Sequence, residues 1–312
     1  MCGIIGLVVK NEPTQKYRES AEKMVSALHH RGPDGKGTHF FDTCILGHTR
    51  LSIVDLNTGG QPMLNGQQNI GITFNGEIYG YKDIRMQLSG YDFKTTSDTE
   101  VILALYDKYA EGMMIHLPGA FSFAIWDDVK KTLFAARDRF GEKPFYYAWG
   151  EGDEFIFASE IKSIVASGLI KPVLDKESLV HYLRHLYVHP YKTIYKNIHV
   201  LPPAHCLKLQ NGKLDIKRYW EMPPVDENIT EEEAIKKFRS LLEKAVEKQL
   251  VADVPVGVFL SGGLDSSTIV AVASQFKKPL KTFSFGFGKT INELPFADEI
   301  VKKYSTEHTE LK

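Results

Sequence analysis

The sequence has almost no excess charge of either sign. Its 38 lysine and arginine residues nearly balance 39 aspartate and glutamate residues, which gives a formal net charge of −1 at pH 7 and a pI of about 6.8. A protein that binds nucleic acid or an anionic membrane through bulk charge carries a basic excess. The composition therefore predicts that neither nucleic acid nor a membrane is a partner.

Cysteines are few, and long hydrophobic runs are missing. The three cysteines, Cys2, Cys44 and Cys206, are odd in number and none has CxxC spacing. This argues against a disulfide framework and a structural zinc site, and it fits a reducing cytoplasm. No apolar stretch approaches the roughly 18 residues of a membrane helix. The run GIIGLVV near the start is short and follows no basic segment, so we expect no signal peptide and a cytoplasmic location.

The remaining composition is that of a globular protein with ample material for buried cores. Of the 312 residues, 43% are hydrophobic and 25% are charged, and at about 150 residues per domain the length predicts two domains. Residues 1–220 contain short apolar or β-rich runs, which predict a strand-rich first domain with interspersed helices. These runs are IIGLVV, LSIVDL, IGITF, AFSFAIW, TLFAAR and PFYYAW. One of the helices is predicted to start after Ser97, with Glu100 completing a capping box.

The pattern changes after a proline-containing linker at residues 221–229. Thr230 and Glu233 form a second capping box, and the helix after them carries an apolar face. The segments that follow, VPVGVFL, STIVAVASQF and TFSFGF, predict a strand, a helix and a second strand. Such a βαβ unit begins a doubly wound parallel sheet, which we assign to residues 230–312.

The sequence SGGLDSS (261–267) lies between that strand and that helix, where an open α/β sheet binds ligands. Gly262 and Gly263 allow the backbone to curl, and Ser266 and Ser267 lie at the helix start, where free N–H groups favour an anion. The loop is neither a Walker A nor a GxGxxG motif. It predicts a phosphate-binding site of another type.

Asp265 in this loop is informative because a carboxylate beside a triphosphate is repulsive unless a cation bridges them. Its presence therefore predicts Mg²⁺. A tight strand–helix turn with Asp265 as a helix cap is the alternative. The two serines, the acidic residue and the flanking elements together favour phosphate binding.

Cys2 stands next to a removable Met1. Once Met1 is lost, Cys2 carries a thiol and an α-amine on one residue, and the amine, with a pKa near 8, is neutral often enough to accept the thiol proton. This is the arrangement of an N-terminal nucleophile. A buried or incidental cysteine is an equally good interpretation from these residues alone.

These features together resemble a known family. The loop SGGLDSS resembles the pyrophosphate-binding loop of ATP pyrophosphatase domains, and the front of the chain resembles class II glutamine amidotransferases, whose mature chains begin with a catalytic cysteine. The two in this order resemble the glutamine-hydrolysing asparagine synthetase family over nearly the whole chain. The supporting stretches are HRGPDGKG (30–37), GHTRLSIVDLNTGGQPM (47–63), FNGEIYGY (74–81), SDTEVI (97–102), ARDRFGEKPFYY (136–147) and FASEIKS (157–163).

The resemblance implies the fold of both parts. Residues 1–220 would form an α+β N-terminal-nucleophile hydrolase domain, an αββα sandwich of two antiparallel sheets. Residues 230–312 would form the N-terminal part of an α/β ATP pyrophosphatase domain. Members of the family are longer, so we expect a second nucleotide and metal motif and most acceptor-binding positions beyond Lys312.

For the glutaminase site, the resemblance implies that Cys2 is the nucleophile and that Asn75 and Gly76 donate N–H groups to the oxyanion of a tetrahedral intermediate. An Asn-Gly pair between two apolar runs is also the strongest short hairpin signal, so a turn at these residues is compatible with the same pattern. His29, His30 and Arg31, the last of which begins RGPDG, have no assigned role, and we interpret this segment as a structural loop.

The resemblance also implies how glutamine is held. The planar fork of Arg50 would bind its α-carboxylate, while Glu77 and Asp98 would meet its α-ammonium. The alternatives are a surface arginine and, for Asp98, an acidic residue that stabilises the first turn of a helix. The backbone of four more residues is expected to line the pocket: Leu51, Ser52, Ile53 and Val54.

For the second site, the resemblance implies ATP as substrate and Asp265 as a ligand of Mg²⁺. An aromatic residue at the position of Phe285, at the end of a strand, could equally belong to a core. The expected ATP-binding residues are Leu260, Ser261, Gly262, Gly263, Asp265, Ser266, Ser267 and Phe285.

The resemblance therefore implies an asparagine synthase that uses glutamine as amide donor. Cys2 would form a γ-glutamyl thioester and release ammonia, and ATP would be cleaved to AMP and pyrophosphate while aspartate is adenylated for amidation. Another carboxylate acceptor is the first alternative, and a non-catalytic glutamine- or nucleotide-binding module is the second. A homodimer is one expected assembly. For residues 1–312 alone we expect glutaminase activity without complete synthesis.

Overall fold

The computed structural model describes residues 1–10, 12–286 and 292–311. Contacts divide the chain into two units, Met1–Met222 and Pro223–Lys312. No helix in the described ranges is long and apolar enough to cross a membrane. All three cysteines carry free thiols.

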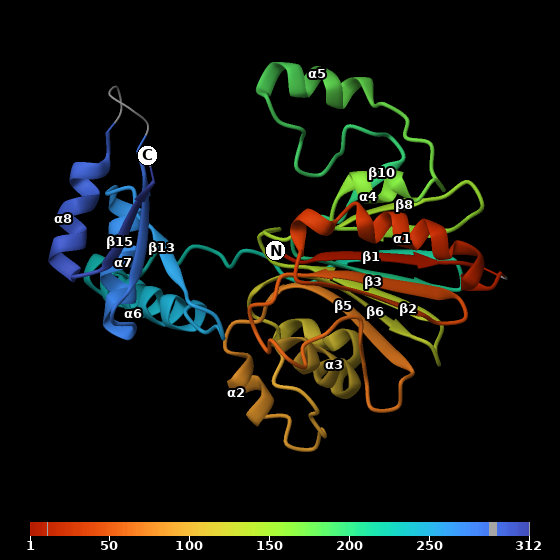
Figure 1. The fold of residues 1–312 in the computed structure, drawn as a ribbon, viewed down its shortest axis with the longest axis horizontal. Helices are drawn as coiled ribbons and strands as arrows, with labels where there is room; N and C mark the ends of the chain where they lie inside the picture. The colour runs from red at the N-terminus through yellow and green to blue at the C-terminus, as the bar shows by residue number, and fades with distance from the viewer. Residues whose placement is uncertain (11, 287–291, 312) are drawn as a thin grey trace. The chain divides into compact units, whose positions relative to one another are not determined.

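The first unit is built on two six-stranded antiparallel sheets (Figure 1). The first sheet, in spatial order, contains β10 (Ile198–Val200), β8 (Tyr146–Trp149), β9 (Phe155–Ala158), β1 (Gly3–Val8), β3 (Cys44–Arg50) and β2 (Gly35–Phe40). The second contains β12 (Lys213–Arg218), β11 (His205–Gln210), β7 (Thr132–Arg137), β6 (Ala120–Asp127), β5 (Ile70–Glu77) and β4 (Met63–Leu64). Their facing sides enclose a core that includes Ile4, Leu46, Trp126 and Phe157.

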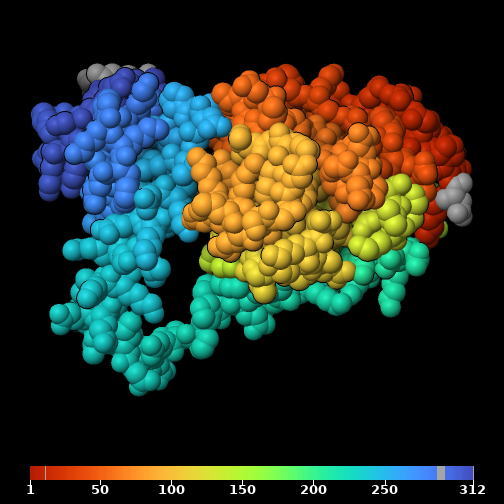
Figure 2. All heavy atoms as spheres, turned by 90° about the horizontal axis from the view of Figure 1, so that it is seen from below, coloured from red at the N-terminus to blue at the C-terminus, as the bar shows by residue number. Residues whose placement is uncertain are grey.

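Helices cover the outer faces of both sheets. On the first sheet lie α1 (Arg18–Ser26) and α4 (Ile161–Ala166), and on the second lie α2 (Tyr81–Met86) and α3 (Asp98–Tyr109) (Figure 1). In the space-filling view the orange and gold atoms of α2 and α3 cover this second face (Figure 2). The helix α5 (Lys176–His185) and the short 3-10 helices η1 (Thr14–Tyr17), η2 (His29–Arg31) and η3 (Ala110–His116) complete the unit. The predicted αββα sandwich is confirmed.

The strand β6 shows why several strands read as continuous apolar runs. All eight of its residues are buried, because the first sheet covers one side of β6 and α3 covers the other. A strand buried on both faces has no need of alternating polar residues.

Two local predictions differ from the structure, and one alternative interpretation is excluded. The run LSIVDL was expected to be a strand, but residues 51–56 form an irregular loop after β3. Asn75 and Gly76 do not form a hairpin turn, since they lie within β5 opposite Ser122 and Phe121 of β6. The capping box at the start of α3 is half formed: Ser97 accepts a hydrogen bond from the N–H of Thr99, whereas the Glu100 carboxylate accepts from the N–H groups of Lys94 and Thr95.

The second unit contains the predicted βαβ pattern. Its elements are α6 (Glu231–Gln249), β13 (Gly257–Phe259), α7 (Leu264–Phe276), β14 (Lys281–Phe285), α8 (Leu294–Tyr304) and β15 (Glu307–Leu311). The strands form a parallel sheet in the order β13-β14-β15. Thr230 and Glu233 form the complete capping box at the start of α6. The apolar face predicted for this helix is mostly exposed within the described chain, since Phe238 is 66% exposed and only Val246 is buried.

Gly6 of β1 tests how tightly the two sheets pack. A Cβ atom at this position would lie 2.2 Å from two ring atoms of Phe157, which is fully buried. We expect Gly6→Ala to lower the free energy of unfolding by about 1–3 kcal/mol, the usual cost of overpacking a core. Chemical denaturation measures this cost. Gly60→Ala is the matched control, because a Cβ there meets nothing within 4 Å, and an equal loss in both variants would contradict the packing argument.

Candidate functional site

Cys2 precedes β1, and its thiol lies against the loop that follows β3. The sulfur accepts a hydrogen bond from the N–H of Leu51 at 3.4 Å and lies 3.6 Å from the carbonyl oxygen of the same residue. Burial raises the pKa of the Cys2 thiol, and the hydrogen bond from Leu51 and the chain-start amine offset only part of this effect. A thiol in this environment needs a local base to become a nucleophile.

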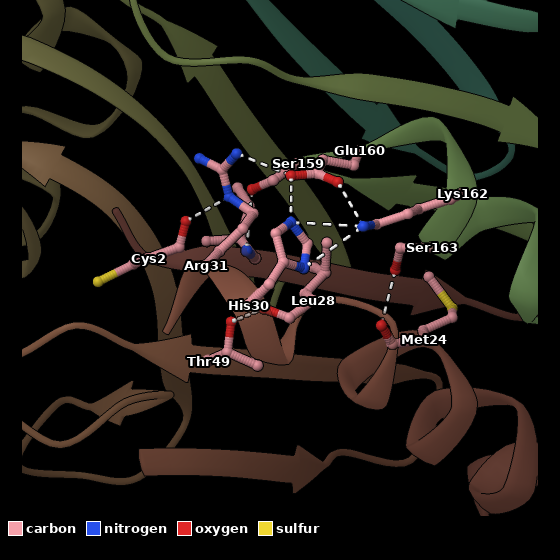
Figure 3. A network of polar contacts seen from close by, with 11 residues as sticks. Cys2, Met24, Leu28, His30, Arg31, Thr49, Ser159, Glu160, Lys162 and Ser163 are labelled. Atoms are coloured by element: carbon pink, nitrogen blue, oxygen red, sulfur yellow. Dashed lines mark hydrogen bonds and ion pairs between the residues drawn. The ribbon is translucent and has the colours of Figure 1, made fainter. Parts of the chain in front are cut away.

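A polar network holds the backbone of Cys2 from behind (Figure 3). Arg31 donates from Nε to the Cys2 carbonyl oxygen at 2.9 Å and from Nη1 to Glu160 at 2.9 Å. His30 Nε2 lies 2.9 Å from the same Glu160 oxygen, and Lys162 lies 3.3 Å from the other. Burial acts against ionisation of Glu160, yet the hydrogen bonds from Arg31, His30 and Lys162 prevail and lower its pKa. The HRG segment therefore anchors the nucleophile, a role that the sequence did not indicate.

Beside the thiol is a small pocket of about 60 Å³ that opens to solvent. Nine of the ten residues predicted for the glutaminase site line it: Cys2, Arg50, Leu51, Ile53, Val54, Asn75, Gly76, Glu77 and Asp98. Ser52 is not in the lining, and its N–H instead donates to Asp34 at 2.8 Å. The pocket thus gathers residues from the segment before β1, from β3 and the loop after it, from β5 and from α3, which lie far apart in the sequence.

Arg50 is held in one position by the loop after β3. Its guanidinium donates to the carbonyl oxygens of Leu56 at 3.4 Å and Val54 at 3.2 Å, and also to that of Asp55. Gly59 leaves the space for it, because a Cβ at this residue would lie 2.6 Å from Arg50 Nη2. Two of the five guanidinium N–H groups, one on Nε and one on Nη1, have no bond to this loop and remain available to a ligand.

Asn75 and Gly76 lie at the end of β5. Asn75 is buried, and its Nδ2 has no hydrogen-bond partner among the described residues. Gly76 has φ +155°, and a Cβ there would lie 2.2 Å from the Ala120 carbonyl oxygen. Burying an amide N–H without a partner costs free energy. Such a donor in the wall of a pocket is what an incoming oxyanion would need.

Two carboxylates form another part of the wall. Burial raises the pKa of Asp98 to about 6, and the negative charge of Glu77 raises it further. The N–H of Ile78, which donates to Asp98 at 3.0 Å, lowers this pKa in part. Burial likewise raises the pKa of Glu77, and Lys143 lowers it in part. A cation that enters the pocket would stabilise the ionised forms of both carboxyl groups and lower their pKa values.

Seven pocket residues were missed from the sequence: Met1, Gly59, Gln61, Phe74, Ser97, Thr99 and Lys143. Gln61 shows what such residues do, since its side chain accepts from the N–H of Phe74 at 2.7 Å and donates to Thr99 at 3.2 Å. It joins β5 to the start of α3. All except Met1 fall within stretches that carry the family resemblance, and that is the signal that could have found them.

The loop of the second unit connects β13 to α7. Gly262 has φ +83°, and a Cβ there would lie 2.6 Å from the backbone nitrogen of Ala297. The Ser261 and Ser266 hydroxyls lie 3.0 Å apart, and the buried Ser267 hydroxyl has no partner among the described residues. Asp265 is exposed in the first turn of α7. The loop therefore presents hydroxyls, N–H groups and one carboxylate at a helix start.

Leu260 and Phe285 differ in their surroundings. Leu260 is 1% exposed and its side chain belongs to the core of the second unit, so only its backbone is near the loop. Phe285 is 48% exposed, and its ring lies 5.7 Å from that of Phe259. An exposed aromatic face at the end of β14 is available to a planar ligand, whereas the Leu260 side chain is not.

Comparison with known proteins identifies the family. Residues 1–220 match the glutamine amidotransferase domain family. The chain belongs to this family. Residues 237–312 of this amidotransferase match the asparagine synthase family.

Individual relatives agree with both matches. The chain is 39% identical to asparagine synthetase [glutamine-hydrolyzing] 3 of Bacillus subtilis over 92% of its own length and 48% of the relative's. It is 34% identical to asparagine synthetase [glutamine-hydrolyzing] of Zea mays over 99% of its own length and 50% of the relative's. The amidotransferase chain thus spans about half the length of these curated relatives.

Solved structures confirm the fold. The glutamine phosphoribosylpyrophosphate amidotransferase of B. subtilis matches with a TM-score of 0.55 at 15% identity, over all of this chain and 91% of that one. The allosteric regulatory enzyme of purine biosynthesis matches with a TM-score of 0.53 at 17% identity, over 99% of this chain and 65% of that one. At this level of identity the likeness concerns the fold alone.

Asp98 gives the site a measurable cost in stability. The pKa of Asp98 in the folded protein lies above its ordinary value, so ionisation of this carboxyl lowers the free energy of unfolding. This destabilisation is absent below about pH 4 and complete above about pH 6. We expect Asp98→Asn to raise the free energy of unfolding at pH 7.5 by on the order of 2 kcal/mol. The gain should shrink towards zero as the pH falls from 6 to 4.

Chemical denaturation across this pH range measures the gain. Asp107→Asn is the matched control, because Asp107 is exposed on the same helix and should show no such dependence. A destabilised Asp98→Asn at pH 7.5 would show that the charge is compensated in the folded protein.

Proposed function

We propose that this chain contains the glutaminase part and the beginning of the synthetase part of a glutamine-dependent asparagine synthetase. The observation that carries the glutaminase part is the pocket in which the Cys2 thiol and the partnerless amide nitrogen of Asn75 meet. The match of residues 237–312 to the asparagine synthase family supports the synthetase part.

In the proposed reaction Met1 is first removed, so that the α-amine belongs to Cys2. This amine accepts the thiol proton, and the sulfur attacks the side-chain carbonyl carbon of glutamine. The oxyanion that forms accepts hydrogen bonds from the Asn75 amide and from the backbone at Gly76. Its collapse expels ammonia, which takes the proton from the amine, and leaves a γ-glutamyl thioester. Water then attacks the thioester and releases glutamate.

Substrate recognition uses the charged walls of the pocket. The guanidinium of Arg50 binds the α-carboxylate of glutamine through its N–H groups that the loop leaves free, and Glu77 and Asp98 bind its α-ammonium. The ammonium stabilises the ionised form of both carboxyl groups, whose pKa values burial raises. Ile53 and Val54 supply apolar contact for the methylene groups.

The second unit binds ATP at the loop 261–267 in this proposal. The partnerless Ser267 hydroxyl and the N–H groups at the start of α7 are available to phosphate oxygens. The exposed ring of Phe285 offers a face to the adenine, and the backbone of Leu260 adjoins the loop.

The donor set fits Mg²⁺ held jointly by protein and substrate. Asp265 is an exposed hard-oxygen ligand, and no group of three or more His, Cys, Asp or Glu side chains gathers as a metal site within the described ranges. Mg²⁺ commonly binds through one carboxylate together with phosphate oxygens. When bound, it would neutralise charge on the pyrophosphate.

The complete reaction joins the two sites. The carboxylate of aspartate attacks the α-phosphate of ATP and releases pyrophosphate, and ammonia displaces AMP to give asparagine. The names of the curated relatives support aspartate as the acceptor, while another carboxylate substrate would use the same chemistry. We further propose a cytoplasmic location, in line with three free thiols, and a homodimer.

Removal of the Cys2 thiol tests the glutaminase proposal. We expect Cys2→Ala to lower glutamate release from glutamine by a factor of about 1,000 or more, since no other nucleophile lines the pocket at this position. Enzymatic glutamate detection on protein whose intact mass shows loss of Met1 measures this. Cys206→Ala is the control and should keep full activity, because Cys206 lies on β11 outside the pocket. Equal rates in the two variants would refute the assignment.

Asp265→Asn tests the cation at the ATP site. MgATP binding should weaken at least about tenfold, which corresponds to roughly 1.4 kcal/mol, because the bridging ligand is lost. Binding of ATP in EDTA should become tighter, because a repulsive charge is removed. Titration calorimetry with and without Mg²⁺ separates the two effects, and Asp298→Asn on α8 serves as control. An equal loss under both conditions would contradict a metal role.

A further inference from the structure

Two histidines lie one turn apart on a helix that packs little against the rest of the first unit. Of the ten residues of α5 (Lys176–His185), only Ser178 is buried (Figure 1). His181 and His185 are four positions apart, so their side chains share one face of the helix. Their ring centres lie 4.6 Å apart. This is the spacing of paired histidine ligands on a helix.

The two rings are close enough to share one metal ion. A bond from a metal ion to an imidazole nitrogen is about 2.0–2.1 Å long, so one ion can lie between rings whose centres are 4.6 Å apart. Both rings line an open hollow on the surface of α5. The other residues that line it are Lys176, Glu177, Val180 and Arg184. Dissolved ions can therefore reach His181 and His185 from solvent.

The segment after α5 determines which nitrogen of His181 is free. Nδ1 of this ring lies 3.0 Å from the carbonyl oxygen of Tyr187. Because a carbonyl oxygen can only accept, Nδ1 donates, and the neutral ring carries its lone pair on Nε2. Histidines that bind metals commonly donate their other N–H to a carbonyl in this way, which orients the ring. An ion pair of 3.1 Å between Lys192 and Glu177 ties the same segment back to the start of α5.

A third histidine, His189, does not complete a three-histidine site. Its ring centre lies 6.0 Å from that of His181, but its Nδ1 accepts a hydrogen bond from the N–H of Tyr191 at 3.3 Å. The neutral His189 ring then carries its proton on Nε2 and has no free lone pair. In agreement, no group of three or more His, Cys, Asp or Glu side chains in the described ranges could hold a metal ion. An ion on α5 therefore has two protein ligands and completes its coordination with water.

The charges around the two histidines indicate which class of metal ion fits. Lys176 and Arg184 bring positive charge to the hollow, and the carboxylate of Glu177 is paired with Lys192. Hard cations such as Mg²⁺ and Ca²⁺ bind through several oxygen ligands, which this face of α5 does not supply. Neutral imidazole is instead a good ligand for Ni²⁺, Cu²⁺ and Zn²⁺. The surroundings therefore favour a late transition metal ion that is bound by nitrogen.

We propose that His181 and His185 form a binding site for a divalent late transition metal ion of the class of Ni²⁺, Cu²⁺ and Zn²⁺. Nε2 of His181 and one ring nitrogen of His185 each replace a water molecule bound to the ion. The ion joins two positions of α5 that are neighbours only when the helix is formed, so it stabilises a short helix that gains little from packing. None of these residues lines the pocket beside Cys2, so the inference is independent of the proposed function.

Calorimetric titration of residues 1–312 with NiCl₂ tests the site. The protein carries no histidine tag, and Cys2→Ala serves as the parent so that this thiol does not compete for the ion. We expect His181→Ala and His185→Ala each to weaken Ni²⁺ binding by at least about tenfold, because either leaves a single ligand. The double variant should lose little more, since the two ligands act as a unit. Alanine is the best helix former, so α5 should persist in all three variants.

Controls and a second measurement locate the ion. His116→Ala should bind Ni²⁺ as the parent does, because His116 is exposed and has no histidine four residues away. Ni²⁺ should slow amide hydrogen exchange across α5 in the parent and not in the double variant, and CaCl₂ should leave this exchange unchanged. Equal Ni²⁺ affinity in His185→Ala and His116→Ala would overturn the site. Ni²⁺ binding without slower exchange in α5 would overturn it as well.

Discussion

Removal of polar groups from water is the constraint on which the pocket beside Cys2 depends. The Cys2 thiol and the Asp98 carboxyl are held in surroundings that favour their neutral forms, and the Asn75 amide nitrogen is buried without a partner. Each of these features costs folding free energy. The same low polarity strengthens every charge interaction that a bound glutamine would make. The low polarity that makes the pocket costly to fold is therefore the same property that favours the proposed reaction.

The sandwich offsets this folding cost because the same strands contribute side chains to the core and to the pocket. Phe74 of β5 packs in the core beneath α3, and Asn75 follows it on the opposite face of the strand, as alternation requires. Gly76 then takes a backbone conformation that places it close to β6. One strand thus anchors itself in the core and presents polar groups within three residues. Rigid elements place such groups more accurately than loops can.

Much of this arrangement could be predicted from the sequence, and the failures have physical causes. Apolar runs located seven of the fifteen strands in the described residues, and the motifs named nine residues that the pocket brings together. The run LSIVDL failed as a strand because its apolar side chains face the pocket instead of a sheet core. Glu100 does not complete the capping box because its carboxylate accepts hydrogen bonds from the N–H groups of Lys94 and Thr95 instead. Local patterns do not reveal which distant groups will compete.

The same limit explains the contacts that no pattern indicated. Arg31 reaches the Cys2 carbonyl across 29 residues, and Gln61 reaches Thr99 across 38. These bonds join loops and helices that the fold brings together, and the periodicity of neither segment indicates them. Motif resemblance marked the stretches in which they occur, but only the fold shows what each side chain holds.

The position of Met1 has a consequence for the proposed reaction. Met1 forms part of the pocket wall and its sulfur lies against Lys143, so its side chain takes up space beside the Cys2 thiol. Under the proposed mechanism, removal of Met1 therefore does two things at once: it frees the α-amine of Cys2 and enlarges the pocket.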